Sequence, residues 1–369
     1  MIRHSDPRSS ATSTAPSRPN EGARITAVKP MLSPALLIDE LPVPDDVATL
    51  VQGSRRAISD VIAGRDSRLL VVVGPCSVHD TEATFEYASR LHERTQAYQD
   101  DLVVVLRSYF EKPRTTLGWK GLVNDPDLDG SFYVNKGLRL ARRLLLRVNG
   151  IGLPTATEFL DTQIPQYFDD LTAWAAIGAR TTESQVHREL ASGLSMPVGF
   201  KNSTDGNVQP AIDAVVAAGS EHWFPGVTKQ GLSAFFHTTG NDTCHVILRG
   251  GASGPNYDRD HVDEVCRRLQ SNGCRPSLMI DCSHGNSLKV FGRQIDVAES
   301  VAQQVERGSQ GIFGVMIESH LVEGRQDLSA GRNLTYGQSI TDGCLSLDAT
   351  IPVLERLAAA RQARDGVRG

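Results

Sequence analysis

The amino-acid sequence predicts an α/β fold, a (β/α)8 TIM barrel with an N-terminal extension and an inserted β-hairpin. Two observations carry this prediction. Eight short apolar runs of strand length recur from residue 69 onward, and amphipathic stretches of helix length separate them. Such alternation is typical of βα units around a parallel sheet, and eight units close a barrel. The 369 residues also exceed the roughly 250 that a barrel needs, which leaves room for appendages.

The eight predicted strands share one property: each run finishes on a charged or metal-binding side chain. They are LLVVVGPC ending at Cys76, LVVVLR at Arg107, IGLPTATE at Glu158, WAAIGAR at Arg180, VGFK at Lys201, HVILR at Arg249, LMIDCSH at His284 and IFGVMIE at Glu318. Helices are predicted between and after them at 82–98, 134–148, 183–194, 209–218, 261–271, 297–307 and 348–364. A barrel places its active site at the carboxyl ends of its strands, so we expect these side chains to converge.

The chain divides into three predicted segments. Residues 1–21 are rich in Ser, Thr, Pro and Arg and are expected to form a disordered tail. Residues 22–66 are expected to form an arm and a helix, and residues 67–369 the catalytic barrel. Two long intervals between strands hold insertions: residues 108–132 suit a functional loop over the site, and the alternating pattern of 222–239 predicts a β-hairpin.

Composition excludes several classes of partner. The formal net charge of -5 argues against a nucleic-acid or membrane-surface partner, since both need a dominant positive field. No apolar run approaches the roughly 18 residues of a membrane span, and the N-terminus lacks the apolar stretch of a signal peptide. The six cysteines form no CxxC pair, which indicates reduced thiols and a cytoplasmic protein.

Six basic residues are expected at one barrel mouth although the protein as a whole is acidic. Mutual repulsion makes such a group costly unless it binds multiply charged anions, and guanidinium groups match phosphate and carboxylate geometry. Phosphorylated substrates are therefore predicted. The alternative for each residue taken alone is a structural pair with Asp or Glu. The six are Arg107, Lys112, Arg114, Arg180, Lys201 and Arg249.

Four further side chains at or beyond strand ends could surround one divalent metal ion. They are Cys76, His284, Glu318 and Asp342. Mixed sulfur, nitrogen and oxygen donors suit Mn²⁺, Fe²⁺, Co²⁺ or Zn²⁺, and Cu²⁺ also binds such sets well, so the identity of the ion stays open. The ion would act as a Lewis acid on an aldehyde oxygen. Two alternatives remain: Cys and His side chains often belong to the core, and Lys201 could instead form a Schiff base.

Eight motifs carry a resemblance to a known family. They are GPCSVHD (74–80), RSYFEKPRTTLGWKGLVNDP (107–126), GARTTESQVHRELASGL (178–194), PVGFKN (197–202), ILRGG (247–251), DCSHGNS (281–287), GVMIESHLVEG (314–324) and YGQSITD (336–342). From about residue 24 to its C-terminus the chain resembles class I 3-deoxy-D-arabino-heptulosonate 7-phosphate (DAHP) synthases. The resemblance implies condensation of phosphoenolpyruvate with erythrose 4-phosphate and water, with release of phosphate, the first step of the shikimate pathway.

The resemblance also assigns roles to residues. It places Cys76, His284, Glu318 and Asp342 at the metal-ligand positions, and Arg107, Arg180, Lys201 and Arg249 at the phosphoenolpyruvate site. Arg114 and Thr115 fall in the loop that holds the sugar phosphate, and Lys112 falls between the two substrates. Lys112 and Lys201 are thus the expected catalytic residues, and Glu158 is expected only to line the site.

Feedback inhibition by an aromatic amino acid is a further implication of the resemblance. Family members bind the effector beside the hairpin and near the N-terminal arm of a neighbouring subunit, so a homodimer or homotetramer is expected. A glycine at the position of Gly226 accompanies tyrosine control in the family. We hypothesise that Gly226, Ser195 and Pro165 line a tyrosine site; the alternative is that Gly226 merely serves a turn.

Two other functions remain open at this point. One is a related synthase that uses arabinose 5-phosphate to make 3-deoxy-octulosonate 8-phosphate, and the other is a non-catalytic barrel that senses an amino acid for a partner protein. The KPRTT sequence at 112–116 argues against the five-carbon substrate. A complete set of metal-binding and basic residues argues against the sensor.

Overall fold

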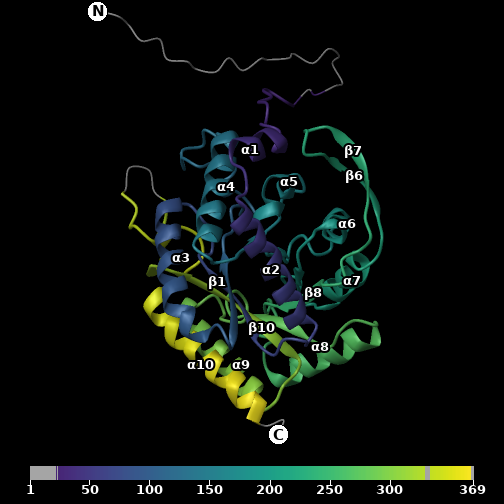
Figure 1. The fold of residues 1–369 in the computed structure, drawn as a ribbon, viewed down its shortest axis with the longest axis vertical. Helices are drawn as coiled ribbons and strands as arrows, with labels where there is room; N and C mark the ends of the chain where they lie inside the picture. The colour runs from purple at the N-terminus through teal and green to yellow at the C-terminus, as the bar shows by residue number, and fades with distance from the viewer. Residues whose placement is uncertain (1–21, 23, 329–332, 367–369) are drawn as a thin grey trace, which may run out of the picture.

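The chain folds into the predicted closed barrel of eight parallel strands with helices around it (Figure 1). The computed structural model describes residues 22, 24–328 and 333–366. The barrel strands follow the order β1-β2-β3-β4-β5-β8-β9-β10, and the additional pairing of β1 with β10 closes the sheet. The predicted disordered tail at 1–21 lies outside the described residues.

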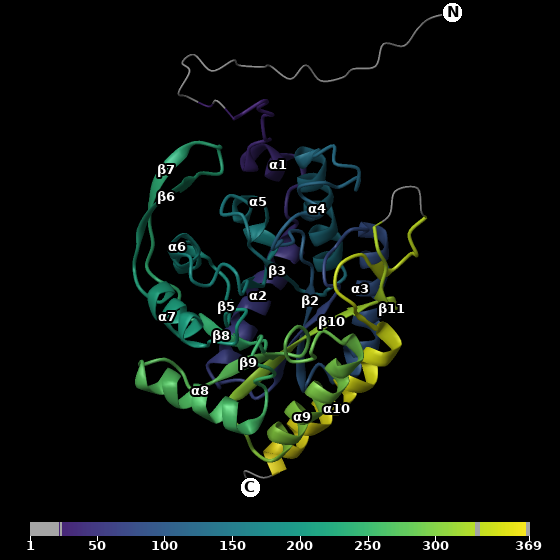
Figure 2. The same cartoon turned by 180° about the vertical axis from the view of Figure 1, so that it is seen from behind.

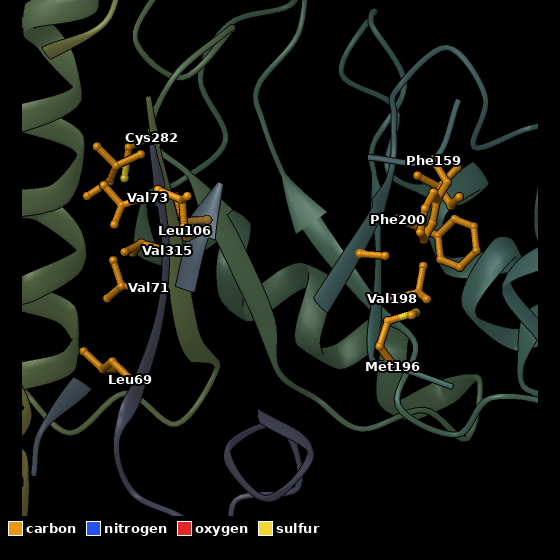
Figure 3. Packing of buried hydrophobic residues seen from close by; sticks show 14 of the residues in the cluster. Leu69, Val71, Val73, Leu106, Phe159, Met196, Val198, Phe200, Cys282 and Val315 are labelled. Atoms are coloured by element: carbon orange, nitrogen blue, oxygen red, sulfur yellow. The ribbon is translucent and has the colours of Figure 1, made fainter. Parts of the chain in front are cut away.

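The barrel strands are short and almost entirely buried, as expected for a parallel sheet covered on both faces. They are β1 (Leu69–Gly74), β2 (Leu102–Arg107), β3 (Thr155–Glu158), β4 (Trp174–Ile177), β5 (Val198–Lys201), β8 (His245–Leu248), β9 (Leu278–Asp281) and β10 (Ile312–His320). In β1, Leu69, Val71 and Val73 belong to the core between sheet and helices, and Figure 3 shows Val71 and Val73 beside Val315. Leu70 and Val72 belong to a second core inside the barrel.

Helices cover the outside of the barrel, and Figure 2 shows the same arrangement from behind. They are α3 (Thr81–Thr95), α4 (Val134–Gly150), α5 (Pro165–Phe168), α6 (Gln185–Gly193), α7 (Gln209–Ala218), α8 (Arg259–Ser271), α9 (Gln294–Glu306) and α10 (Leu347–Gly366), with 3₁₀ turns at Gln96–Tyr98, Asp169–Leu171 and Phe291–Arg293. Local sequence fixes several starts: the Asp80 carboxylate, for example, accepts hydrogen bonds from the first amides of α3. Within the described part of the chain, no helix has the length and apolar character needed to cross a bilayer.

The extension before the barrel forms α1 (Pro34–Glu40) and α2 (Asp45–Ile62). Ile58, Val61 and Ile62 of α2 join the core inside the barrel, so this helix closes the end where the strands begin. The opposite end, where the strands finish, is therefore left for the substrate site.

The predicted hairpin is present as the antiparallel pair β6 (Trp223–Val227) and β7 (Ser233–His237). It lies outside the ring of helices, beside α6 (Figure 1). The Ala35 amide of the arm donates to the Lys229 carbonyl in its turn at 2.6 Å. Three short strands, β11 (Val322–Arg325), β12 (Gln338–Ser339) and β13 (Leu345–Ser346), follow β10.

Several strands end earlier than their apolar runs suggested. Strand β1 stops at Gly74, and Cys76 lies in the loop after it, because Pro75 has no amide to continue the ladder. Arg180, Arg249 and His284 likewise follow the ends of β4, β8 and β9. The strand ends predicted at these residues were therefore too late, and the residues belong to the first turns of the βα loops. Cys76 and His284 lie just beyond a strand end, as expected for the candidate metal ligands.

The barrel interior contains a buried histidine, His245 on β8. Its Nε2 accepts a hydrogen bond from Trp174 Nε1 at 3.3 Å, and its Nδ1 lies 3.0 Å from the Thr243 carbonyl oxygen. These partners fit a neutral imidazole that donates from Nδ1. Burial lowers the pKa of His245 to about 4.

We predict that this histidine makes the fold acid-sensitive. An unfolded chain protonates the imidazole near pH 6.5, whereas the folded pKa is about 4, so the stability contributed by neutral His245 is complete above about pH 6.5 and is lost towards pH 4. The loss amounts to about 3 kcal/mol. Urea titrations between pH 7 and pH 4 measure the free energy of unfolding. This free energy should fall less steeply with falling pH in His245→Gln than in the unaltered protein. The exposed-residue control His261→Gln should keep the wild-type slope, and equal slopes for all three proteins would contradict the prediction.

Candidate functional site

A cavity of about 500 Å³ opens at the carboxyl ends of the barrel strands. All six basic residues that sequence reasoning selected line it, together with four other predicted site residues: Arg107, Lys112, Arg114, Arg180, Lys201, Arg249, Thr115, Glu158, His284 and Asp342. Cys76 and Glu318 are fully buried and do not belong to its lining. Residues that are far apart in sequence thus share one pocket because eight loops meet at the same end of the barrel.

The four predicted metal-ligand side chains lie next to one another. Ligand atoms of Cys76, Glu318 and Asp342 all lie within 4.8 Å of each other. His284 stands beside this group, with Nε2 3.7 Å from Glu318 Oε1. Its backbone has a φ of 56°, and this left-handed turn belongs to the sharp loop that follows β9.

The chemistry of this group fits a divalent cation. Glu318 Oε1 is buried without a hydrogen bond, although Arg107 Nη2 lies 3.2 Å away as an ion pair. A buried carboxylate oxygen with so little compensation is costly, and a cation would supply what is missing. Burial raises the pKa of the Cys76 thiol to about 11, so its thiolate needs a strong positive partner such as a metal ion.

Lys112 is the basic side chain closest to this group. Its Nζ donates to Cys76 Sγ at 2.8 Å and to Asp342 Oδ2 at 3.0 Å. Burial lowers the pKa of Lys112, but the charges of Cys76 and Asp342 outweigh burial and raise the pKa above its ordinary value. The same ammonium group holds the pKa of Asp342 well below its usual range. Lys112 is therefore a fixed positive charge between the ligand group and the cavity.

Three of the six basic residues have carboxylate partners at the floor of the site. Besides Lys112, Arg107 pairs with Glu318 at 3.2 Å and Lys201 pairs with Asp281 at 2.8 Å. Arg107 also donates to the Cys76 carbonyl at 2.6 Å and lies 3.6 Å above the ring centre of Tyr109. These contacts fix the directions of the side chains without removing them from the cavity.

The other three basic residues make no ion pair with any carboxylate that the structure describes. Arg180 Nη2 donates to Thr115 Oγ1 at 3.1 Å, Arg114 Nε donates to the Trp119 carbonyl at 2.8 Å, and Arg249 bonds to the carbonyl of Gly250. Positive charge is thus left uncompensated around the cavity, as an anion-binding site requires.

Sequence reasoning missed three ionisable residues at this site. Asp281 is fully buried, and burial raises its pKa, but His284 and Lys201 outweigh burial and hold the pKa well below its usual range. Burial, aided by Asp161, raises the pKa of the cavity-lining Glu111 to about 8. Lys289 also lines the cavity, from a left-handed turn with a φ of 60°. Asp281 and Lys289 lie in or near the DCSHGNS motif, which was the available signal.

Glu158 lies against the backbone of the neighbouring strand. A Cβ atom built on Gly178 would come within 2.6 Å of Glu158 Oε1, so only glycine allows this carboxylate its position. Glu158 Oε1 is buried without a hydrogen-bond partner within the described chain, and the residue lines the cavity. Its carboxylate is therefore available to polar groups of a bound molecule.

The three residues predicted to line an effector site also share one cavity. Pro165, Ser195 and Gly226 line a pocket of about 430 Å³ between the hairpin and α5 and α6, together with Phe224 and Phe236. Gly226 lies inside β6, paired with Ala234, so the alternative that it serves a turn is wrong. A Cβ atom on Gly226 would come within 2.8 Å of Phe236 Cε2. The absence of a side chain thus leaves space for the Phe236 ring.

Comparison with known proteins places this architecture in a family. The DAHP synthetase I family matches residues 44–355. The chain is 54% identical over 347 residues to the Phe-sensitive phospho-2-dehydro-3-deoxyheptonate aldolase of Escherichia coli, covering 94% of this chain and 99% of that protein. It is 51% identical over 345 residues to the tyrosine-inhibited enzyme of Schizosaccharomyces pombe, covering 92% and 93%.

A solved structure agrees with the sequence comparison. The phospho-2-dehydro-3-deoxyheptonate aldolase of Francisella tularensis superimposes with a TM-score of 0.90 at 52% identity, covering 91% of this chain and 98% of that one. Fold, length and sequence therefore agree over nearly the whole chain. This protein belongs to the DAHP synthetase I family.

Proposed function

We propose that this chain condenses phosphoenolpyruvate with D-erythrose 4-phosphate and water to give DAHP and inorganic phosphate. This reaction is the first step of the shikimate pathway, which leads to chorismate and the aromatic amino acids. One observation carries the proposal: a single cavity is lined both by a ring of basic side chains and by His284 and Asp342, whose buried neighbours Cys76 and Glu318 complete the ligand group. The site thereby offers anion binding and metal binding within one pocket.

Phosphoenolpyruvate would bind to Arg107, Arg180, Lys201 and Arg249. Arg107 and Lys201 are already oriented by Glu318 and Asp281, so little side-chain freedom is lost when they bind the anion. Arg180 and Arg249 supply guanidinium groups that can bind phosphate or carboxylate through two hydrogen bonds. This arrangement would hold C3 of the substrate in a fixed direction for attack on the aldehyde carbon.

Erythrose 4-phosphate would bind with its phosphate at Arg114 and Thr115. Lys112 lies between that loop and the metal-ligand group, because its ammonium contacts Cys76 and Asp342. From there it can donate a hydrogen bond to the aldehyde oxygen as negative charge develops on it. Glu158 would line the pocket near the reacting carbons.

One divalent ion would be held by Cys76, His284, Glu318 and Asp342. When bound, such an ion supplies Lewis-acid polarisation of a carbonyl oxygen. The donor set accepts Mn²⁺, Fe²⁺, Co²⁺ or Zn²⁺. Arg107 and Lys112 then keep the surrounding charge balanced, since each lies against a carboxylate of the ligand set.

The decisive experiment measures phosphate release from phosphoenolpyruvate with each of two acceptor sugars. The proposal expects release with erythrose 4-phosphate and none above background with arabinose 5-phosphate, and mass spectrometry should identify DAHP. Activity with arabinose 5-phosphate alone would favour the octulosonate synthase. No activity with either sugar, for metal-loaded protein, would favour a non-catalytic sensor.

Tyrosine is the proposed feedback inhibitor, bound in the pocket of Pro165, Ser195 and Gly226. Overall identity does not select the effector, because relatives named Phe-sensitive, tyrosine-inhibited and Trp-sensitive are 50–54% identical to this chain. The local support is Gly226, whose lack of a Cβ leaves space beside Phe236. The hairpin at 222–239 would then be regulatory, in a homodimer or homotetramer.

We predict that Gly226→Ser weakens tyrosine inhibition at least about tenfold. The new Cβ would come within 2.8 Å of Phe236 Cε2, so this ring, which lines the pocket, must shift. A displaced ring removes room for a phenol, which corresponds to about 1.4 kcal/mol or more. Inhibition curves with tyrosine, phenylalanine and tryptophan measure the change.

The matched control is Ser233→Ala on the exposed side of the same hairpin. It should leave all three inhibition curves unchanged. Equal inhibition of the unaltered protein by all three amino acids would remove the tyrosine site from consideration.

We place the protein in the cytoplasm. The support is its cysteines, since all six are free thiols in the structure. Reduced thiols of this kind persist in a reducing compartment.

A further inference from the structure

Asp281, the carboxylate of the DCSHGNS motif, contacts more than the Lys201 side chain that it orients. It is the last residue of β9 and has no exposed surface. Its Oδ2 atom accepts a hydrogen bond from Lys201 Nζ at 2.8 Å and lies 2.9 Å from His284 Nδ1. Its Oδ1 atom accepts from the Ser283 amide at 2.9 Å. One oxygen atom therefore contacts a phosphoenolpyruvate residue and a metal-ligand residue at once.

We infer that Asp281 is a positioning residue that couples the two halves of the site, so that a change at Lys201 alters the affinity of the metal ligands. The identity of the two halves, the phosphoenolpyruvate site and the metal site, rests on the proposed function. Lys201 and His284 share one oxygen atom of Asp281, and no hydrogen bond or ion pair joins these two described side chains directly.

The contact with His284 decides which ring nitrogen can bind a metal ion. Nδ1 faces Asp281, and Nε2 faces Glu318 at 3.7 Å. The contact between His284 Nδ1 and Asp281 Oδ2 is short, but its angles do not meet those of a hydrogen bond. A carboxylate at this position favours the tautomer with its proton on Nδ1, which leaves the Nε2 lone pair directed towards the ligand group. Outer partners of this kind commonly set the affinity of a histidine ligand.

The contact with Lys201 acts through the same atom. Lys201 lies at the end of β5 and Asp281 at the end of β9, with β8 between them. Both side chains are almost without exposure, so the ion pair is little screened by water. Removing the ammonium group would leave Oδ2 to His284 alone and strengthen that interaction. Metal affinity should respond although Lys201 contacts none of the four ligand residues.

Asp281→Asn provides the first test, because it keeps the size of the side chain. The asparagine amide has no negative charge to favour the tautomer with its proton on Nδ1, and it offers one acceptor oxygen where the carboxylate offered two, so Lys201, His284 and the Ser283 amide can no longer all keep their contacts. Titration calorimetry with Mn²⁺ on chelator-treated protein, without substrates, should give an affinity about 10 to 100 times weaker. The control is Asp170→Asn, which weakens the ion pair of the buried Arg142 with Asp170, two residues that do not line the cavity.

A double-mutant cycle tests the coupling itself. Lys201→Met should tighten Mn²⁺ binding at least about threefold in the otherwise unaltered protein, by the release of Asp281 to His284. In the Asp281→Asn background the same change should alter Mn²⁺ affinity less than about twofold. A direct effect of the lysine charge would instead persist in both backgrounds.

Three outcomes would overturn the inference: Mn²⁺ affinity of Asp281→Asn within twofold of the unaltered protein, a weakening no greater than that of Asp170→Asn, or equal effects of Lys201→Met in both backgrounds. These measurements contain no substrate. An active protein with no coupling therefore defeats this inference alone, whereas coupling in a protein that forms no DAHP defeats the proposed function alone.

Discussion

Removal of the divalent ion by a chelator should lower DAHP formation at least about a thousandfold, and a single added divalent ion should restore it. The chain offers Lys112 as a hydrogen-bond donor near the aldehyde, but one ammonium group replaces only part of the charge stabilisation that an ion provides. A thousandfold lower rate corresponds to the loss of about 4 kcal/mol of transition-state stabilisation. Phosphate release after chelation and after addition of Mn²⁺, Fe²⁺, Co²⁺ or Zn²⁺ provides the measurement.

Cys76→Ala should reproduce that loss without a chelator. Cys76 is fully buried beneath the cavity, and its thiol points at the group formed with Glu318 and Asp342. The control is Cys244→Ala, which removes another buried thiol before β8, at the opposite end of the barrel. The prediction is contradicted by a Cys76→Ala protein that keeps more than about a tenth of the activity.

The barrel could be predicted because its strands are nearly continuous apolar runs. In β1, side chains on both faces are buried, against helices on one side and against the barrel interior on the other. Because both faces of such a strand are apolar, the run does not depend on which residues face the helices. The presence of the strand can therefore be predicted from sequence alone. The end of the strand could not be predicted in this way, because the run of residues up to Cys76 suggested a later boundary than Gly74, where Pro75 stops the ladder.

The candidate site was only partly predictable for a different reason. Side-chain type and strand position selected the basic residues, and the structure brings all six to one cavity. Asp281 was not predicted as a site residue because it lies inside the predicted strand LMIDCSH, and the sequence does not show which side chains a carboxylate there would contact. Only the order of β5, β8 and β9 places it beside Lys201, and strand order is a property of the folded sheet.

The same distinction applies to the pairing of charges. Sequence reasoning allowed a structural carboxylate partner for every basic residue, and three of the six have one. The partners of Arg107 and Lys112, however, are Glu318 and Asp342, which belong to the ligand group. Pairing therefore does not remove these residues from function, because it orients them towards the place where both substrates and the ion would meet.

Lys201→Met should lower kcat/KM for phosphoenolpyruvate about a hundredfold to a thousandfold. The variant loses a charged hydrogen-bond donor to the substrate, and it leaves Asp281 as a buried carboxylate without its ammonium partner. Losses of this kind total about 3 to 4 kcal/mol. Initial rates at varied phosphoenolpyruvate measure the effect, and Arg267→Met, on an exposed face of α8, should leave the rates unchanged.

The Lys201 variant also separates two chemistries for the lysine. A Schiff base needs a neutral amine, whereas the ammonium of Lys201 is held at 2.8 Å from the ionised Asp281 carboxylate in a site with almost no exposure. An ammonium group in this ion pair binds anions and has no lone pair with which to attack a carbonyl. Borohydride added during turnover should therefore leave the protein mass unchanged. A reduced adduct that forms on the unaltered chain and is lost in Lys201→Met would show that the lysine acts as a nucleophile, and the assignment of Lys201 to anion binding would then fail.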